Sequence, residues 1–227
     1  MKRFTILFCL MGFLFLAKGQ NLYIGAKMGG HVGSAFIDHS ITNFTMRAGF
    51  EPGFHGGVMF KFLPEPRNVF LKSGLQLSVN YVQKGWSQVF LTTEPKYKAR
   101  MNYVEIPIEG VGYFGRKNKY FVAAGFYMEF LQSYSLAEDP DASNLGGQDF
   151  ITYSPGRDNE VGYGVRASGG VFRDFSFGQL HLEGFFAYTI SNFINPGSLL
   201  GDIPDISNLW TTGVSLGYLF SLNGKNK

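Results

Sequence analysis

The chain has 227 residues, among them 24 phenylalanines, 12 tyrosines and 30 glycines, and only 16% of its residues are charged. It carries 20 basic and 17 acidic side chains, but Lys2, Arg3 and Lys18 lie in the first few residues, so the remainder holds 17 of each sign. This balance gives no support for nucleic-acid binding. Because the single cysteine, Cys9, lies in the same N-terminal segment, the remainder has no disulfides, thiolate metal sites or cysteine nucleophiles.

Residues 1–19 have the pattern of a cleaved secretory signal. Two basic residues precede an apolar run from Phe4 to Leu16, and Ala17 and Gly19 supply the small residues that a signal peptidase reads. We expect Gln20 to be the first mature residue and residues 20–227 to form one domain. No later stretch reaches the roughly 18 apolar residues that a membrane-spanning helix needs, so a helical membrane protein is not expected.

Alternation of apolar and polar residues predicts eight strands, which the many glycines and aromatic residues also favour. The predicted strands cover residues 22–33, 50–63, 69–83, 98–114, 119–133, 159–173, 178–191 and 208–221.

The connections between these strands alternate between long and short along the whole chain. An even number of strands with such alternation is typical of outer-membrane barrels, which have short periplasmic turns and long outer loops. The sequence therefore predicts an all-β fold, an eight-stranded antiparallel up-and-down transmembrane β-barrel. Its first and last strands must pair, since lipid cannot satisfy an open sheet edge.

The two faces of the strands support this interpretation. In the last strand Val214 and Leu216 share an apolar face, while Thr211 and Ser215 lie on the other. Aromatic residues on the apolar face gather near strand ends, as membrane-interface girdles do. They are Phe60, Phe62, Phe114, Tyr120, Tyr188, Trp210 and Tyr218. A secreted soluble lipid-binding barrel is an alternative, but it needs the apolar face inside.

The polar faces place charged and imidazole side chains in the lumen. They are Lys27, His31, Glu51, His55, Lys61, Lys72, Lys84, Glu105, Glu109, Glu129, Arg166, His181 and Glu183. Five carboxylates match five lysine or arginine side chains, and we expect them to satisfy one another because unpaired charges in a narrow lumen are costly.

The run NYVEIPIEGVGYFG, residues 102–115, allows particular ion pairs in the lumen to be predicted. Antiparallel pairing across GRKNK sets Glu105 opposite Glu129, so a cation must lie close. We expect Arg166 to bridge these two carboxylates and Lys72 to lie near Glu109. A proline in a paired strand removes a ladder donor, and we expect a bulge at Pro107.

Other chemistry receives less support from the sequence. The facing glutamates could act as general acid and base, but a structural ion network accounts for them more simply. GYGVRASGG, residues 162–170, has dinucleotide-type spacing without a following helix, and HExxH and GxSxG are absent, although a hydrolase on the barrel wall remains an alternative. Loop residues Asp139, Asp141, Asn144 and Asp149 could bind calcium, but they lack the EF-hand glycine and glutamate, which favours a solvated acidic loop. No cofactor is expected.

Two motifs resemble a known family. Gln83-Lys84-Gly85 ends one strand, and Tyr103, Glu105, Ile106 and Pro107 form a tyrosine-x-glutamate-isoleucine-proline strand. These residues resemble the PorT-like outer-membrane β-barrel family of the Bacteroidetes. The resemblance implies the outer membrane of a Gram-negative bacterium and an accessory role in type IX secretion. It implies no enzymatic activity.

The last strand also has the pattern of a barrel-assembly signal, with Thr211, Gly213, Leu216 and Tyr218 at the usual spacing. It departs from that pattern by continuing to Lys227. We expect contacts with outer-membrane lipid and, during biogenesis, with the barrel-assembly machinery.

The sequence leaves three functions open. The first is a non-enzymatic structural or binding role through the outer loops and a protein partner. Apolar loop residues would either contact that partner or cap the barrel. They are Phe90, Leu91, Phe150, Ile151, Leu199, Leu200 and Ile203. The second is a small-solute pore, which needs an open lumen. The third is the soluble lipid-binding barrel.

Overall fold

The computed structural model describes residues 20–39, 44–46, 48–64, 70–89, 95–138, 153–176, 178–196 and 205–222. Its strands are β1 (Gln20–His39), β2 (Phe44–Met46), β3 (Ala48–Pro64), β4 (Lys72–Val89), β5 (Pro95–Phe114), β6 (Asn118–Glu138), β7 (Val161–Phe175), β8 (Gly178–Thr189) and β9 (Ile206–Ser221). No helix in the described part of the chain is long and apolar enough to cross a membrane.

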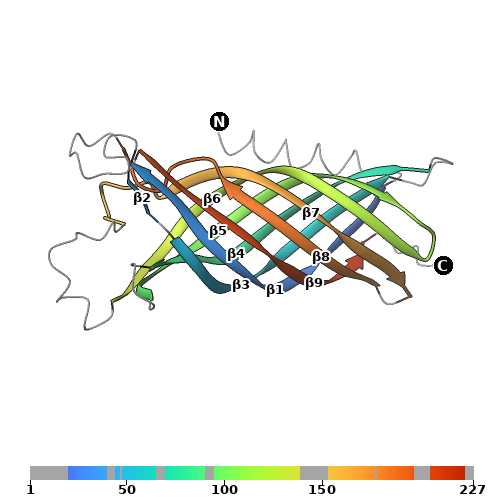
Figure 1. The fold of residues 1–227 in the computed structure, drawn as a ribbon. Coiled ribbons are helices and arrows are strands. Elements are labelled where there is room, and N and C mark those ends of the chain that lie inside the picture. The colour runs from blue at the N-terminus through green and yellow to red at the C-terminus, as the bar shows by residue number, and fades with distance from the viewer. Residues whose placement is uncertain are drawn as a thin grey trace, which may run out of the picture.

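Eight long antiparallel strands close into a barrel, which confirms the predicted fold. Each strand pairs with its neighbour along the chain, and β1 pairs with β9 from Tyr23↔Ser221 to Asp38↔Ile206. The strands tilt steeply across the barrel, and the β5–β6 and β7–β8 turns lie at the end opposite β2 (Figure 1). The turn after β5 is tight, and Gly115 takes a φ of 111° there, a conformation that favours glycine.

Several strands are longer than the alternation predicts. β1 continues to His39, β4 to Val89 and β6 to Glu138, all at the end with the long loops. On β5 and β6 the outward residues there are polar, and Asn102 Nδ2 donates to Ser133 Oγ at 2.8 Å. The backbone ladder therefore continues beyond the apolar band. In this region apolar and polar residues no longer alternate, so the sequence gives no sign of the strand. β2, which pairs with β1 through Ile37↔Met46, is too short to show a period.

The side chains alternate between lipid and lumen as predicted. β8 alternates between buried and exposed residues along most of its length, and its exposed positions include Leu180, Leu182 and Phe186. Val122, Phe126 and Val214 are also among the exposed apolar residues, whereas the buried residues include charged ones such as Lys61 and Glu183. This arrangement is the reverse of a soluble lipid-binding barrel, so that alternative is wrong.

The lumen is filled in three layers. Near the short turns lies an apolar layer that includes Tyr23, Met59, Tyr113 and Phe172. Charged and polar side chains occupy the middle. At the end with the long loops a second apolar layer forms, and its residues are Ala35, Ile37, Trp86, Ala99, Met101, Tyr103, Tyr153, Phe193, Ile194 and Leu209.

Pro107 does not produce the bulge that the sequence predicts. It pairs with Tyr127 in an unbroken β5–β6 register, and the nearest register shift lies between Asn102 and Tyr103. On the β4 side the pairing is interrupted opposite Ser78 and Val79 but resumes in the same register. The N–H that Pro107 lacks therefore interrupts the pairing with β4 locally, and the strand contains no bulge there.

Candidate functional site: the lumen ion network

The middle layer of the lumen holds four carboxylates and four cationic side chains, all nearly inaccessible to solvent. The carboxylates are Glu105, Glu109, Glu129 and Glu183, and the cations are Lys27, Lys61, Lys84 and Arg166. The strands place them there because lumen-facing positions recur every second residue. Equal numbers of opposite charges allow a narrow lumen to hold them without a net charge.

Glu105 and Glu129 lie directly opposite each other on β5 and β6, as the sequence predicts. Lys84 lies between them, with its Nζ 2.5 Å from Glu129 Oε2 and 3.3 Å from Glu105 Oε2. Thr189 Oγ1 donates to the second oxygen of Glu129 at 3.1 Å. Lys84 therefore supplies the cation that this like-charged pair requires.

The predicted role of Arg166 is only partly correct. Its Nη1 is 3.4 Å from Glu105 Oε1, but its strongest contact is Nη2 to Glu183 Oε1 at 2.8 Å. Its Nε lies 3.6 Å from Glu109 Oε2. Arg166 thus joins Glu105 to Glu183 and Glu109, and no ion pair with Glu129 occurs among the described residues. The β6–β7 register sets Arg166 opposite Gly125 and Glu129 opposite Gly162, so the arginine lies four residues along the strand from Glu129, while Lys84 reaches Glu129 across the lumen.

The prediction that Lys72 lies near Glu109 is wrong. The β4–β5 register sets Lys72 opposite Tyr113 and Gln76 opposite Glu109. Gln76 Nε2 donates to Glu109 Oε2 at 2.9 Å, and Ser168 Oγ donates to Glu109 Oε1 at 2.9 Å. A neutral amide and a hydroxyl therefore take the place that the sequence assigns to a lysine.

Residues that the sequence places in the lumen without a role extend the network toward the short turns. Glu183 accepts from Lys27 Nζ at 3.2 Å and contacts His181 Nε2 at 3.2 Å. Lys61 lies beside His181, with its Nζ 3.1 Å from Nδ1 of that ring and 3.8 Å from the ring centre of Phe172. Aromatic faces thus help to accommodate a buried ammonium group.

Two histidines form the remaining part of this layer. His31 Nδ1 and His55 Nδ1 are 3.1 Å apart, and His31 Nε2 is 2.7 Å from the Gln83 carbonyl oxygen. Because Nε2 of His31 must donate to that carbonyl, its Nδ1 accepts from His55 if both rings are neutral. A Cβ on Gly53 would lie 2.6 Å from His31 Nε2, so glycine leaves the room that this ring needs.

The two motifs of the family resemblance meet in this network. β4 and β5 pair through Lys84↔Met101 and Val82↔Tyr103, which brings Lys84 of one motif to Glu105 of the other. Gly85 faces the Ala99 carbonyl, which a Cβ would approach to 2.4 Å. The Tyr103 ring centre lies 5.7 Å from Lys84 Nζ. Lys84, Tyr103 and Glu105 of these motifs therefore pack and pair inside the barrel, whereas Gln83 and Ile106 occupy the alternate, less buried positions.

The other predicted sites are distributed over the surface or lie beyond the described residues. Thr211 and Gly213 face the lumen, and Leu216 and Tyr218 face outward, with Leu216 54% exposed. The proposed signal at 1–19, the acidic loop residues Asp139, Asp141, Asn144 and Asp149, and the apolar loop residues from Phe90 to Ile203 fall outside the described ranges. Within those ranges no group of three or more His, Cys, Asp or Glu side chains could hold a metal ion.

The long-loop end of the lumen is covered by two described segments, residues 153–160 and 190–196. Phe193 stacks on Trp86 with ring centres 4.9 Å apart, and Tyr153 contacts Tyr134 at 5.1 Å. The buried carboxylate of Asp158 accepts from the backbone N–H of Ser154 at 2.7 Å and of Asn195 at 3.2 Å. Asp158 therefore ties the two segments together over the apolar layer.

Solved structures that are similar to this chain include the outer membrane protein OprG and two further bacterial proteins. OprG of Pseudomonas aeruginosa is 12% identical, with a TM-score of 0.50 over 88% of this chain and 96% of that chain. Ail of Yersinia pestis, solved with the heparin analogue sucrose octasulfate, is 9% identical, with a TM-score of 0.42 over 88% and 99%. The neisserial surface protein NspA is 14% identical, with a TM-score of 0.41 over 87% and 96%.

The family of the chain is assigned from its sequence. No curated protein matches it significantly. The family model described as the outer membrane protein beta-barrel domain matches residues 18–195, which is most of the chain. Together with the closed eight-stranded barrel and its apolar outer face, this match shows that the chain belongs to the outer membrane β-barrel domain family and is an outer-membrane protein.

Proposed function

We propose that this protein is a non-enzymatic outer-membrane barrel with a closed lumen, which acts by binding a partner at its outer end. The observation that carries the proposal is the filled lumen, in which a charge-balanced middle layer lies between two apolar layers. Eight strands enclose a space that side chains can fill completely. Such a barrel serves as a rigid support for its outer loops.

The environment of the two facing glutamates argues against catalysis. Each is 1% exposed, and Lys84 lies between their carboxylates. A general acid and base need access to a substrate, which side chains buried this deeply in the lumen do not have. These residues are better suited to stabilising the barrel.

The outer end is better suited to binding. Segments 153–160 and 190–196 are held together by Asp158 and cover the mouth. The long connections that join the strands begin at this end, and loops on a rigid scaffold commonly carry recognition. A protein partner is the occupant we expect, and the apolar loop residues named above are its candidate contacts.

A more specific role follows from the resemblance to PorT-like proteins, which rests on the motifs at Gln83–Gly85 and Tyr103–Pro107. By that resemblance we propose that the partner belongs to the type IX secretion apparatus. Deletion of the protein in its native host should then lower secretion of type IX cargo. Unchanged secretion together with capture of an unrelated membrane partner would retain the binding role and remove the secretion assignment.

The closed lumen is tested in planar bilayers. Purified protein, shown to be folded by heat-modifiable migration, should give no conductance steps in 1 M KCl, while a general porin in the same bilayers gives them. Steady ohmic steps from this protein would favour the alternative of a small-solute pore. Insertion is verified separately by flotation of protein-loaded liposomes, so an absence of steps cannot be attributed to failed insertion.

A further inference from the structure

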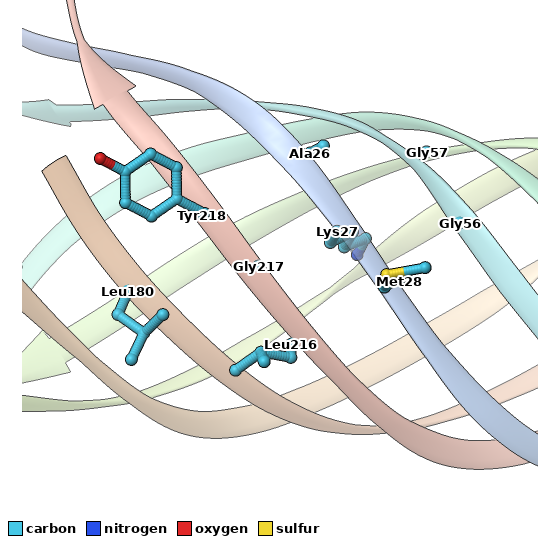
Figure 2. Close-up of a pocket in the computed structure, with 9 residues that line it drawn as sticks. All are labelled: Ala26, Lys27, Met28, Gly56, Gly57, Leu180, Leu216, Gly217 and Tyr218. Atoms are coloured by element: carbon cyan, nitrogen blue, oxygen red, sulfur yellow. The ribbon is translucent and has the colours of Figure 1, made fainter.

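The lipid-facing surface of the barrel carries a groove across the seam where the first and last strands meet. It has a volume of about 490 Å³ and crosses β3, β1, β9 and β8. Ala26 and Gly56 form its floor, while Met28, Leu180, Leu216 and Tyr218 form its walls (Figure 2). Lys27, which lies between two of these residues, sends its own side chain into the lumen to Glu183.

The groove exists because two outward positions lack bulk. Ala26 pairs with Tyr218 on one side and with Val58 on the other, and Gly56 pairs with Met28 and Tyr81. Met28 is 71% exposed, so it projects beyond this floor. The surrounding outward residues are large and apolar, so the hollow is bounded by hydrocarbon on every side that the structure describes.

We propose that this groove binds one acyl chain of a phospholipid of the periplasmic leaflet. The surface around the groove is continuous with the apolar band that the family places against lipid, and a carbon-lined hollow at that depth is filled by hydrocarbon at lower cost than by water. The hollow lies beside projecting side chains such as Met28, and such a surface suits a flexible chain better than the broad wall of a second barrel.

Tyr218 fixes which leaflet supplies the chain. It lies three positions before the end of β9, and its hydroxyl would be 2.7 Å from a Cβ on Gly178, the first residue of β8. Gly178 follows a short turn, and short turns face the periplasm in this class of barrel. Tyrosine prefers the membrane interface, so the headgroup should lie near Tyr218 while the chain extends toward Met28.

Two residues assigned to the predicted assembly signal, Leu216 and Tyr218, thus line a site in the finished barrel. A test must therefore avoid them, because their substitution could impair biogenesis instead of binding. Ala26 and Gly56 line the groove but are not part of the predicted assembly signal, so their substitution tests binding separately from biogenesis. A Cβ on Gly56 would meet its nearest atom, the Lys27 carbonyl oxygen, at 3.5 Å, which is an ordinary contact.

The experiment is native mass spectrometry of the purified full chain titrated with phosphatidylethanolamine. Wild type should retain one phospholipid, and Ala26→Phe and Gly56→Leu should each weaken retention at least tenfold. Ala124→Phe is the matched control, since Ala124 is also exposed, on β6, and lies outside the groove. Heat-modifiable migration shows which variants are folded.

Equal retention by wild type and both groove variants would overturn the proposal, as would equal loss in Ala124→Phe. A wild-type dimer that both groove variants abolish would assign the groove to a second copy instead. Stronger retention of lipopolysaccharide than of phosphatidylethanolamine, again lost in both groove variants, would overturn the assignment to the periplasmic leaflet.

Discussion

Lys84 is the residue on which the centre of the barrel depends. It contacts Glu105 and Glu129, which face each other across β5 and β6 and have almost no solvent exposure. Removing one member of a buried ion pair is costly because the remaining charge keeps its desolvation penalty. Here one lysine contacts two carboxylates, and although Arg166 also lies near Glu105, the loss of Lys84 would leave Glu129 without its cation.

We expect Lys84→Met to lower the free energy of unfolding by at least about 3–5 kcal/mol, the range for a broken buried pair. Adding Glu129→Gln should recover part of this loss, because it removes the carboxylate that loses its cation. Urea titration of protein refolded into detergent micelles measures both. Lys98→Met is the control, since Lys98 is half exposed and 3.9 Å from Glu51, and should cost about 1 kcal/mol or less. Equal losses in both single variants would contradict the central role of Lys84.

Strand β9 combines two tasks that can be separated. Its inward residues Thr211 and Ser215 pack in the lumen, whereas Leu216 and Tyr218 project outward. Pairing with both β1 and β8 gives the strand its place in the barrel. The outward residues therefore lie away from the lumen layers, on the face that the assembly machinery would contact.

Tyr218→Ala should lower the amount of folded protein in the outer membrane several-fold in cells. The same variant, refolded in vitro, should unfold within about 1 kcal/mol of wild type, because few core contacts are lost. Val214→Ala, on the same face of the same strand, should leave assembly unchanged. Comparison of membrane-fraction yield with the urea midpoint separates the two effects. A large drop in the urea midpoint of Tyr218→Ala would reassign the residue to stability.

At the scale of the whole molecule, hydrogen bonds and apolar packing join the outer cover to the barrel strands. Asp158 holds segment 153–160 to segment 190–196, and Arg157 donates to the same carboxylate from Nε at 2.8 Å. That hydrogen bond raises the pKa of the Arg157 guanidinium, so the pair stays charged in alkaline solution. The barrel wall below depends on its own ladder and on the lumen layers.

Asp158→Ala should loosen the cover while leaving the barrel closed. Limited proteolysis should cut within residues 153–160 or 190–196 at least several-fold faster than in wild type, because backbone donors of both segments lose their acceptor. The heat-modifiable transition should stay within a few degrees of wild type. Glu160→Gln is the control, since Glu160 lies in the same segment and is exposed, and its substitution leaves the Asp158 carboxylate in place. Unchanged cleavage in Asp158→Ala would show that apolar packing and the remaining hydrogen bonds hold the cover without this carboxylate.

The sequence by itself determined the barrel, its topology and the face of each strand. Residues on alternate sides of a strand differ in polarity, and the lengths of the connections distinguish the two ends, so no long-range information was needed. The β5–β6 register also followed, since a short turn fixes which residues oppose one another. This is why Glu105 and Glu129 could be placed face to face in advance.

Only the tertiary structure decided which cation serves which carboxylate. Arg166 and Lys84 both enter the lumen, but their reach across it depends on the register of non-adjacent strands and on barrel closure, which local alternation does not specify. The same holds for Gln76 replacing Lys72 beside Glu109 and for the unbulged strand at Pro107. The groove on the outer wall is likewise decided only by the tertiary structure. Ala26 and Gly56 become neighbours of Leu216 and Leu180 only when β1 pairs with β9 and closes the barrel.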